Sequence, residues 1–192
     1  MFPIKNRRGK IAGFGARSID NSEPKYINTP KTDVFDKSGI LYGLDVSHQS
    51  IISERQAIVV EGYMDVIAAH QHATNNVIAS MGTAVTDTQL SQLKSLCDTL
   101  ILALDSDTAG KEATSRKLEE ILIDSVDKNM MGFNRRIGPI IRRDMVEIKI
   151  CLLPEGSDPD DLIRNDLAAW QKLIKESVTC LLYTSPSPRD GL

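Results

Sequence analysis

The sequence predicts an α/β fold in which a mostly parallel sheet is flanked by helices and preceded by a small basic subdomain. Two observations predict it. From residue 57 onward, short apolar runs alternate with amphipathic segments of about 10–15 residues, which is typical of βαβ units and a parallel sheet. Before residue 52, Pro, Asn, Asp and Ser are dense and Lys and Arg are interspersed. We therefore expect a basic N-terminal subdomain at 1–52, of mixed α+β or β type, and the α/β domain at 53–178.

The basic subdomain begins with two expected strands. Residues 2–17 place apolar runs on both sides of a polar turn at 6–9. Gly13 and Gly15 inside the second run predict bends or a close approach by a neighbouring segment. Residues 18–45 are expected to be rich in loops, and residues 41–52 predict a helix that leads into the next domain.

The α/β domain follows in a regular order. Strands are expected at 57–61, 76–80 and 99–105, each followed by a helix, at 64–72, 87–97 and 109–123. Asp87 is the expected cap of the second helix. Residues 125–144 interrupt the pattern as an inserted loop or hairpin. A strand at 146–153, an acidic turn at 154–161 and one amphipathic helix at 162–177 complete the domain.

Charge is distributed unevenly along the chain. The formal net charge is −3, but residues 1–50 carry +3 and the remainder carries −6. A basic N-terminal segment that faces an acidic remainder of the chain suits the binding of a polyanion next to metal ions.

The cysteines and the apolar runs exclude several classes of protein. Cys97, Cys151 and Cys180 are odd in number and lack CxxC spacing, which disfavours a zinc site or disulfides and favours thiols in a reducing compartment. No apolar run approaches the roughly 18 residues of a membrane span, and we expect no signal peptide. We expect a cytoplasmic protein. His48, His70 and His72 are interpreted as surface residues.

Acidic residues follow two of the predicted strands. Glu61 ends one strand, and Asp105 and Asp107 end another, two residues apart and therefore on one face. Ligands bind at the carboxyl edge of such sheets. Carboxylates that converge there repel one another, and a hard divalent cation relieves the repulsion. With no His or Cys nearby, the oxygen donors favour Mg²⁺ or Mn²⁺.

A second acidic pair admits two interpretations. Asp158 and Asp160 have the same spacing and would serve a second ion, as in phosphoryl or nucleotidyl transfer. The same residues precede a predicted helix and form a good capping sequence.

Several motifs together resemble a known family. A strand that ends in Glu61-Gly62 and a later one that ends in Asp105-x-Asp107 resemble the Toprim domain of primases, topoisomerases and some nucleases. In order along the chain, further motifs resemble the catalytic core of DnaG-type DNA primases: PKYINTP (24–30), Phe35-x-Lys37, LYG (41–43), VVEGYMDV (59–66), SMGTA (80–84), DSDTAG (105–110) and LLPEGSDPDDLI (152–163).

The resemblance implies a nucleotidyltransferase that makes short RNA primers on single-stranded DNA from ribonucleoside triphosphates during replication, beside the replicative helicase. It implies two or more Mg²⁺ or Mn²⁺ ions on catalytic residues that match Glu61, Asp105 and Asp107, supported by Asp65, Asp158 and Asp160. Arg17, Lys25 and Lys37 match the family's basic residues, which grip triphosphate or template phosphates. Tyr63 is assigned to nucleotide or DNA binding, with packing of the first helical turn as its alternative.

The chain departs from the family pattern in three respects. Ser106 stands where the family usually has glycine, and the 125–144 insertion is long. We expect the zinc-binding and helicase-binding domains of the family to be absent from this sequence. We therefore expect a fragment with weak or no priming activity alone, and a non-native tail at 179–192.

Four alternative functions make different demands on the sequence. A topoisomerase needs a nucleophilic tyrosine, for which Tyr26, Tyr42 and Tyr63 are poor candidates. A phospho-receiver domain needs a lysine after its last strand, and none is present. A Toprim nuclease, which attacks with metal-bound water, and a non-catalytic nucleic-acid-binding module remain open.

Overall fold

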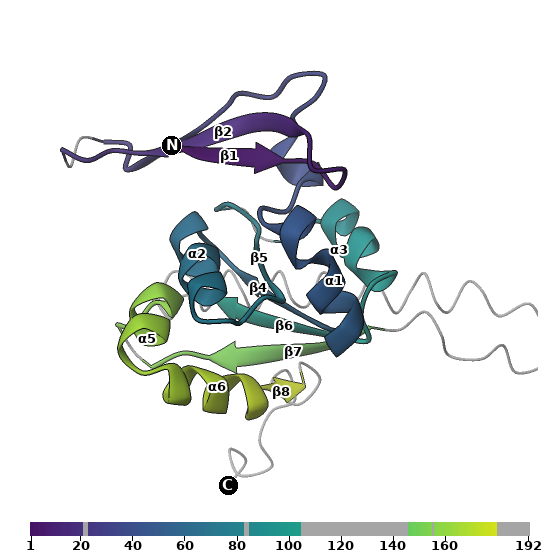
Figure 1. Ribbon diagram of the computed structural model, residues 1–192, viewed down its shortest axis with the longest axis vertical. Helices are drawn as coiled ribbons and strands as arrows, with labels where there is room; N and C mark the ends of the chain where they lie inside the picture. Colours follow the sequence, from purple (N-terminus) through teal and green to yellow (C-terminus); the bar gives the residue numbers. More distant parts are fainter. Residues whose placement is uncertain (21–22, 83–84, 105–145, 155, 180–192) are drawn as a thin grey trace, which may run out of the picture.

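The computed structural model describes residues 1–20, 23–82, 85–104, 146–154 and 156–179. They form two sheets, an antiparallel sheet in the order β1-β2-β3 and a five-stranded sheet in the order β5-β4-β6-β7-β8. Figure 1 shows the smaller sheet lying over the helices of the larger unit. None of the described helices is both long and apolar enough to cross a membrane.

The smaller sheet confirms the two strands expected before residue 18. β1 (Phe2–Lys5) pairs antiparallel with β2 (Ile11–Arg17). The Asn6 side chain closes the turn between them, because its Oδ1 accepts from the backbone N–H of Arg8 and Lys10. A third strand, β3 (Tyr26–Asn28), lies where the sequence predicts loop.

The larger unit confirms the predicted α/β alternation. Strands β5, β4, β6 and β7 are parallel neighbours, and β8 adds an antiparallel edge. After a 3-10 turn η1 (Lys37–Gly39), the elements in chain order are α1 (Leu44–Glu54), β4 (Gln56–Val60), α2 (Tyr63–Gln71), β5 (Val77–Ala79), α3 (Asp87–Lys94), β6 (Thr99–Leu104), β7 (Glu147–Leu152), α5 (Pro159–Asn165), α6 (Leu167–Lys175) and β8 (Val178–Thr179).

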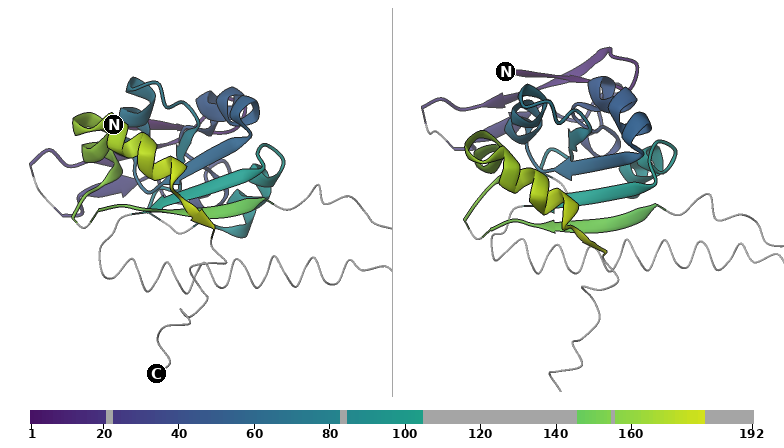
Figure 2. Two further views of the ribbon diagram at one scale, coloured as in Figure 1. Left: turned by 90° about the horizontal axis from the view of Figure 1, so that it is seen from below. Right: turned by 60° about the horizontal axis from the view of Figure 1, so that its bottom comes forward.

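Helices cover both faces of this sheet, as Figures 1 and 2 show. Strand β4 is buried on both sides, so its residues alternate between two apolar clusters. Val59 packs in the cluster that includes residues of α1 and α3, whereas Ile58 and Val60 pack in the cluster of α2, α5 and α6. The fully buried Trp170 anchors α6 in the second cluster.

Two expected helices differ in the structure. Thr86, not Asp87, caps α3: its hydroxyl accepts from the Gln89 N–H while the Gln89 side chain accepts from the Thr86 N–H. The single helix expected at 162–177 is two helices, because Asp166 ends α5 and its side chain caps α6 through the Ala169 N–H. The helix expected at 109–123 and the 125–144 insertion lie outside the described residues, as do residues 180–192 of the expected tail.

The two described cysteines are buried free thiols, as the sequence indicates. Burial raises the pKa of both Cys97 and Cys151 to about 11, so the reactive thiolate is scarce at pH 8. We expect both to resist iodoacetamide at pH 8 in the native chain and to react fully in urea, as peptide mapping by mass spectrometry would measure. Rapid native labelling of Cys97 or Cys151 would contradict the buried assignment.

Candidate active site

A pocket of about 450 Å³ lies between the N-terminal sheet and the segment that follows β4. Its lining comes from the N-terminal sheet, from the segments that follow β4 and β5, and from the first turns of α2 and α5. The residues that line it are Arg17, Lys25, Tyr26, Asn28, Glu61, Gly62, Tyr63, Met64, Asp65, Met81, Gly82, Asp158, Asp160 and Asp161. The pocket therefore joins the basic subdomain to the acidic domain.

The acidic wall is built around Asp65. This buried carboxylate accepts from the Gly62 N–H at 2.9 Å, which caps α2, and from the Asp160 N–H at 3.2 Å. It therefore fixes the start of α5 against the start of α2. Glu61 is half-buried at the exit of β4, on the same wall.

The second acidic pair has structural contacts of its own. Asp158 caps α5 by accepting from the Asp161 N–H at 2.7 Å, and Asp160 pairs with Arg164 one turn later. The capping interpretation of Asp158 is thus correct. Both aspartates nevertheless line the pocket beside Glu61, so capping and a contribution to the pocket's charge coexist.

The basic wall comes from the N-terminal sheet. Arg17 ends β2 and Lys25 immediately precedes β3. The Arg17 guanidinium lies 5.7 Å from the centre of the Tyr26 ring, in cation–π geometry. Lys37 does not line the pocket. Its Nζ lies 3.7 Å from the position that a Cβ on Gly82 would occupy, which places the amino group at the pocket's edge.

Tyr26 is exposed to the charges of both walls. Burial raises the pKa of its hydroxyl, and the negative charges of Asp65, Asp160 and Asp158 raise it further, while Arg17 opposes them. Cationic and anionic groups thus face the same space, an arrangement that suits a phosphate chain accompanied by metal ions.

Tyr63 connects the two walls. Only 3% of its surface is exposed, its hydroxyl donates to Oδ1 of Asn28, and its ring stacks on Phe2 with centroids 4.9 Å apart. Burial raises its pKa to about 12. The ring of Tyr63 is therefore packed, as the alternative interpretation of this residue expects. Tyr63 also lines the pocket.

Several residues that line the pocket, among them Tyr26 and Asn28, are not predicted as site residues from the sequence. Both belong to the PKYINTP motif, which was the available signal. Their strand has only three residues in a polar segment, so periodicity does not reveal which side chains face the pocket.

Part of the predicted metal site lies outside the described residues. Within them, no group of three or more His, Cys, Asp or Glu side chains is placed to hold an ion. Asp105 and Asp107 lie outside these residues. Strand β6 runs parallel to β4 and leaves the sheet at the same edge as Glu61, with Val59 opposite Leu102.

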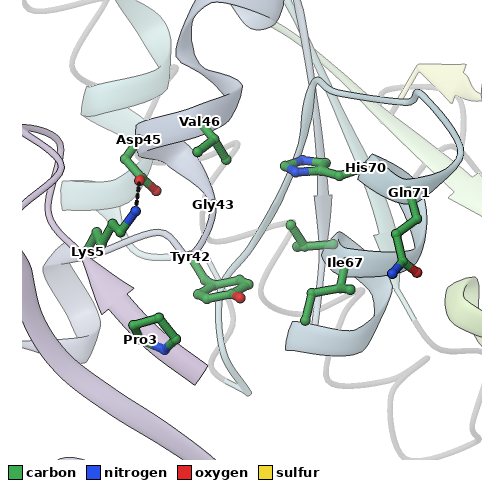
Figure 3. A pocket seen from close by; sticks show the side chains of 10 residues that line it. Pro3, Lys5, Tyr42, Gly43, Asp45, Val46, Ile67, His70 and Gln71 are labelled. Atoms are coloured by element: carbon green, nitrogen blue, oxygen red, sulfur yellow. Dashed lines mark ion pairs between the residues drawn. The ribbon is translucent and has the colours of Figure 1, made fainter. Parts of the chain in front are cut away.

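A second pocket of about 400 Å³ lies between β1, α1 and α2 (Figure 3). Lys5 and Asp45 form an ion pair at 3.4 Å on one side, and His70 lies across from them. Nε2 of His70 lies 2.9 Å from the carbonyl of Val77 and 3.1 Å from the Ser47 hydroxyl. His70 is thus a half-buried residue whose ring contacts both α1 and β5.

Comparison with known proteins places this arrangement in a family. A Toprim-like family model matches residues 58–137, and the model for the N-terminal domain of the DNA primase catalytic core matches residues 1–48. A DNA primase of Clostridium acetobutylicum is 39% identical over 95% of this chain and 27% of its own length. That of Escherichia coli K12 is 37% identical over 100% of this chain and 31% of its own length.

Solved structures agree with these sequence matches. A DnaG primase catalytic domain bound to single-stranded DNA has a TM-score of 0.79 at 33% identity, over 98% of this chain and 55% of that one. A DNA primase domain from Pseudomonas aeruginosa has a TM-score of 0.76 at 35% identity, over 93% of this chain and 51% of that one. The fold is thus Toprim-type, preceded by the primase N-terminal subdomain.

The chain spans between 27% and 31% of the length of these curated relatives. Within that span the two family models follow in the primase order, and the sequence and structural matches cover nearly all of the chain. The chain belongs to the DnaG-type DNA primase family, in the region of its catalytic core.

Proposed function

We propose that this chain provides the catalytic core of a DNA primase, which joins ribonucleoside triphosphates into short RNA primers on single-stranded DNA. The observation that carries the proposal is the pocket in which Arg17 and Lys25 face Glu61 and the aspartates. Primer synthesis joins a ribose hydroxyl to the α-phosphate of a triphosphate and releases pyrophosphate. Such a reaction needs cations around the phosphates and a way to stabilise the leaving group.

The basic wall has the chemistry to hold phosphates. Arg17 and Lys25 are exposed, and no carboxylate in the described part of the chain pairs with either. Their charges are thus available to a triphosphate or a template phosphate, and binding is expected to weaken as salt is added. Lys37 at the pocket's edge would extend the same surface.

The acidic wall fits a divalent metal by the chemistry of its donors. Primases with a Toprim-like domain are metal-dependent as a family. Every acidic side chain of the pocket offers oxygen, and the described residues that line it include no His or Cys, which favours Mg²⁺ or Mn²⁺. We infer that Glu61 holds two or more ions together with Asp105 and Asp107, supported by Asp65, Asp158 and Asp160. When bound, such ions neutralise charge on the phosphates.

Partners follow from the same proposal. A related catalytic domain has been solved with single-stranded DNA bound, and we infer the same template class for this chain. Ribonucleoside triphosphates would be the substrates and the RNA primer the product. A replicative helicase in the cytoplasm, at the replication fork, would be the partner of the complete protein.

A single reaction tests the proposal against its alternatives. The full chain is incubated with single-stranded DNA, labelled ribonucleoside triphosphates and Mg²⁺ or Mn²⁺, and both the RNA products and the template are resolved on a gel. Short RNA that appears only with metal and template is expected. Shortened template without RNA would favour a Toprim nuclease, and metal-independent DNA binding with neither product would favour a non-catalytic binding module.

A further inference from the structure

The side chain of Tyr63 crosses from one wall of the pocket to the other. Tyr63 is the first residue of α2 and lies two positions after Glu61, so its backbone belongs to the acidic wall. Its ring extends to the N-terminal sheet, which carries Arg17 and Lys25. The two walls of the pocket therefore meet at this side chain.

The ring is held in one orientation by its surroundings. Phe2 stacks on it at an interplanar angle of 7°, and Tyr42 meets it nearly edge-on, at 85° with centroids 4.7 Å apart. On the β2 side, a Cβ at Gly15 would lie only 2.5 Å from Cζ of Tyr63. The phenol ring thus packs closely against the backbone of Gly15, and the direction of its hydroxyl group is fixed.

The hydroxyl group of Tyr63 points at the side chain of Asn28. The Tyr63 hydroxyl donates to Oδ1 of Asn28. A carboxamide is planar, with its acceptor oxygen and its two-donor nitrogen on opposite sides. When Oδ1 is held by Tyr63, the orientation of the Nδ2 amide is determined as well.

The amide nitrogen of Asn28 is available to donate hydrogen bonds to a ligand in the pocket. Among the described residues, no hydrogen bond uses Nδ2, and Asn28 lines the pocket between the basic and acidic walls. The oxygens of phosphate and ribose are acceptors, and they match the two N–H donors of this amide.

We propose that Tyr63 is a positioning residue: its buried hydroxyl orients Asn28 so that the Asn28 amide donates to an oxygen of the bound ribonucleoside triphosphate. The inference rests on the proposed function and extends it to two side chains. Tyr63 acts through Asn28, because its ring is 3% exposed and its hydroxyl proton is already donated.

The test measures the affinity of the full chain for ATP with Mg²⁺ by calorimetry, together with the melting temperature of each variant. Asn28→Ala is expected to weaken binding by about tenfold, the effect of losing one hydrogen bond to a charged group. Tyr63→Phe keeps the ring and is expected to weaken binding by about three- to tenfold. The double variant Tyr63→Phe/Asn28→Ala should bind no more weakly than Asn28→Ala alone, because the hydroxyl then has nothing to orient.

Asn28→Asp separates positioning from folding. Aspartate has the same shape and still accepts from Tyr63, so the melting temperature should stay close to that of the parent chain. It places a negatively charged acceptor where the amide donates, and ATP affinity should fall by more than about tenfold. Tyr42→Phe is the matched control: it removes a hydroxyl from the neighbouring ring, which does not line the site pocket, and should leave ATP affinity unchanged.

The outcomes separate this inference from the proposed function. If the parent chain binds no ATP, the proposed function fails for this chain, and the inference fails with it. If ATP binds and Arg17→Ala weakens it while Tyr63→Phe does not, only the inference is overturned. Additive losses in the double variant would likewise overturn it, because Tyr63 would then act independently of Asn28.

Discussion

Replacing Glu61 with glutamine is expected to slow ribonucleotide incorporation by at least about a hundredfold, the loss typical of removing a charged group that stabilises a reacting centre. Glu61 follows β4 directly, lines the pocket and faces the cationic wall. Glutamine keeps the size of the side chain and removes its charge. The substitution therefore weakens the hold on a divalent cation while it leaves the packing of β4 and α2 in place. Initial rates measured over a range of Mg²⁺ concentrations would show the effect.

Glu54→Gln provides the control for this substitution. Glu54 is an exposed carboxylate at the end of α1 that does not line the pocket. The same change of charge there should leave incorporation within about twofold of the parent chain, as expected for a surface substitution. Equal rates for Glu61→Gln and Glu54→Gln, with both proteins folded, would remove Glu61 from the metal site.

Replacing Gly15 with alanine is expected to lower the free energy of unfolding by about 2–3 kcal/mol, within the range for overpacking a well-filled site. The added Cβ would lie 2.5 Å from Cζ and 2.6 Å from the hydroxyl oxygen of Tyr63. The ring has little room to retreat, since Phe2 and Tyr42 pack against it. Urea denaturation followed by circular dichroism would measure the loss.

Gly39→Ala is the matched control, because a Cβ at Gly39 meets only Cγ2 of Thr88, at an ordinary distance of 3.9 Å. Its effect should stay within about 0.5 kcal/mol. The double variant Gly15→Ala/Tyr63→Leu should lose less stability than the sum of its single variants, since the smaller side chain relieves the clash. Strict additivity would show that Gly15 and Tyr63 do not compete for the same space.

The sequence predicts most of the larger sheet because its signals are local. Runs of apolar residues such as 57–60 are β-branched and short, and each is followed by an amphipathic segment, so the strand–helix order is readable without tertiary information. The helix ends are less readable. Thr86 and Asp166 compete with neighbours that have similar capping ability, and only the hydrogen bonds of Gln89 and Ala169 decide between them.

The site is predictable only in part, because some of its residues are defined by contacts between distant segments of the chain. Glu61 is recognisable because it follows a strand. Lys25 is recognisable from the PKYINTP motif, and Arg17 from its match to the basic residues of the family. All three line one pocket. The role of Asn28 depends on contact with Tyr63, which lies 35 residues away. Neither propensity nor periodicity contains such a pairing, because it arises from how the N-terminal sheet packs against the start of α2.

The hydrogen bonds of Asp65 have a consequence for the order in which the molecule is assembled during translation. Asp65 accepts from Gly62, three residues earlier, and from Asp160, 95 residues later. The first bond is available as soon as α2 emerges from the ribosome, whereas the second awaits α5. A nascent chain that ends before residue 158 thus has Arg17, Lys25 and Glu61 but lacks the carboxylates of α5. Because contacts between distant segments form late, the acidic wall is completed only after α5 has been synthesised.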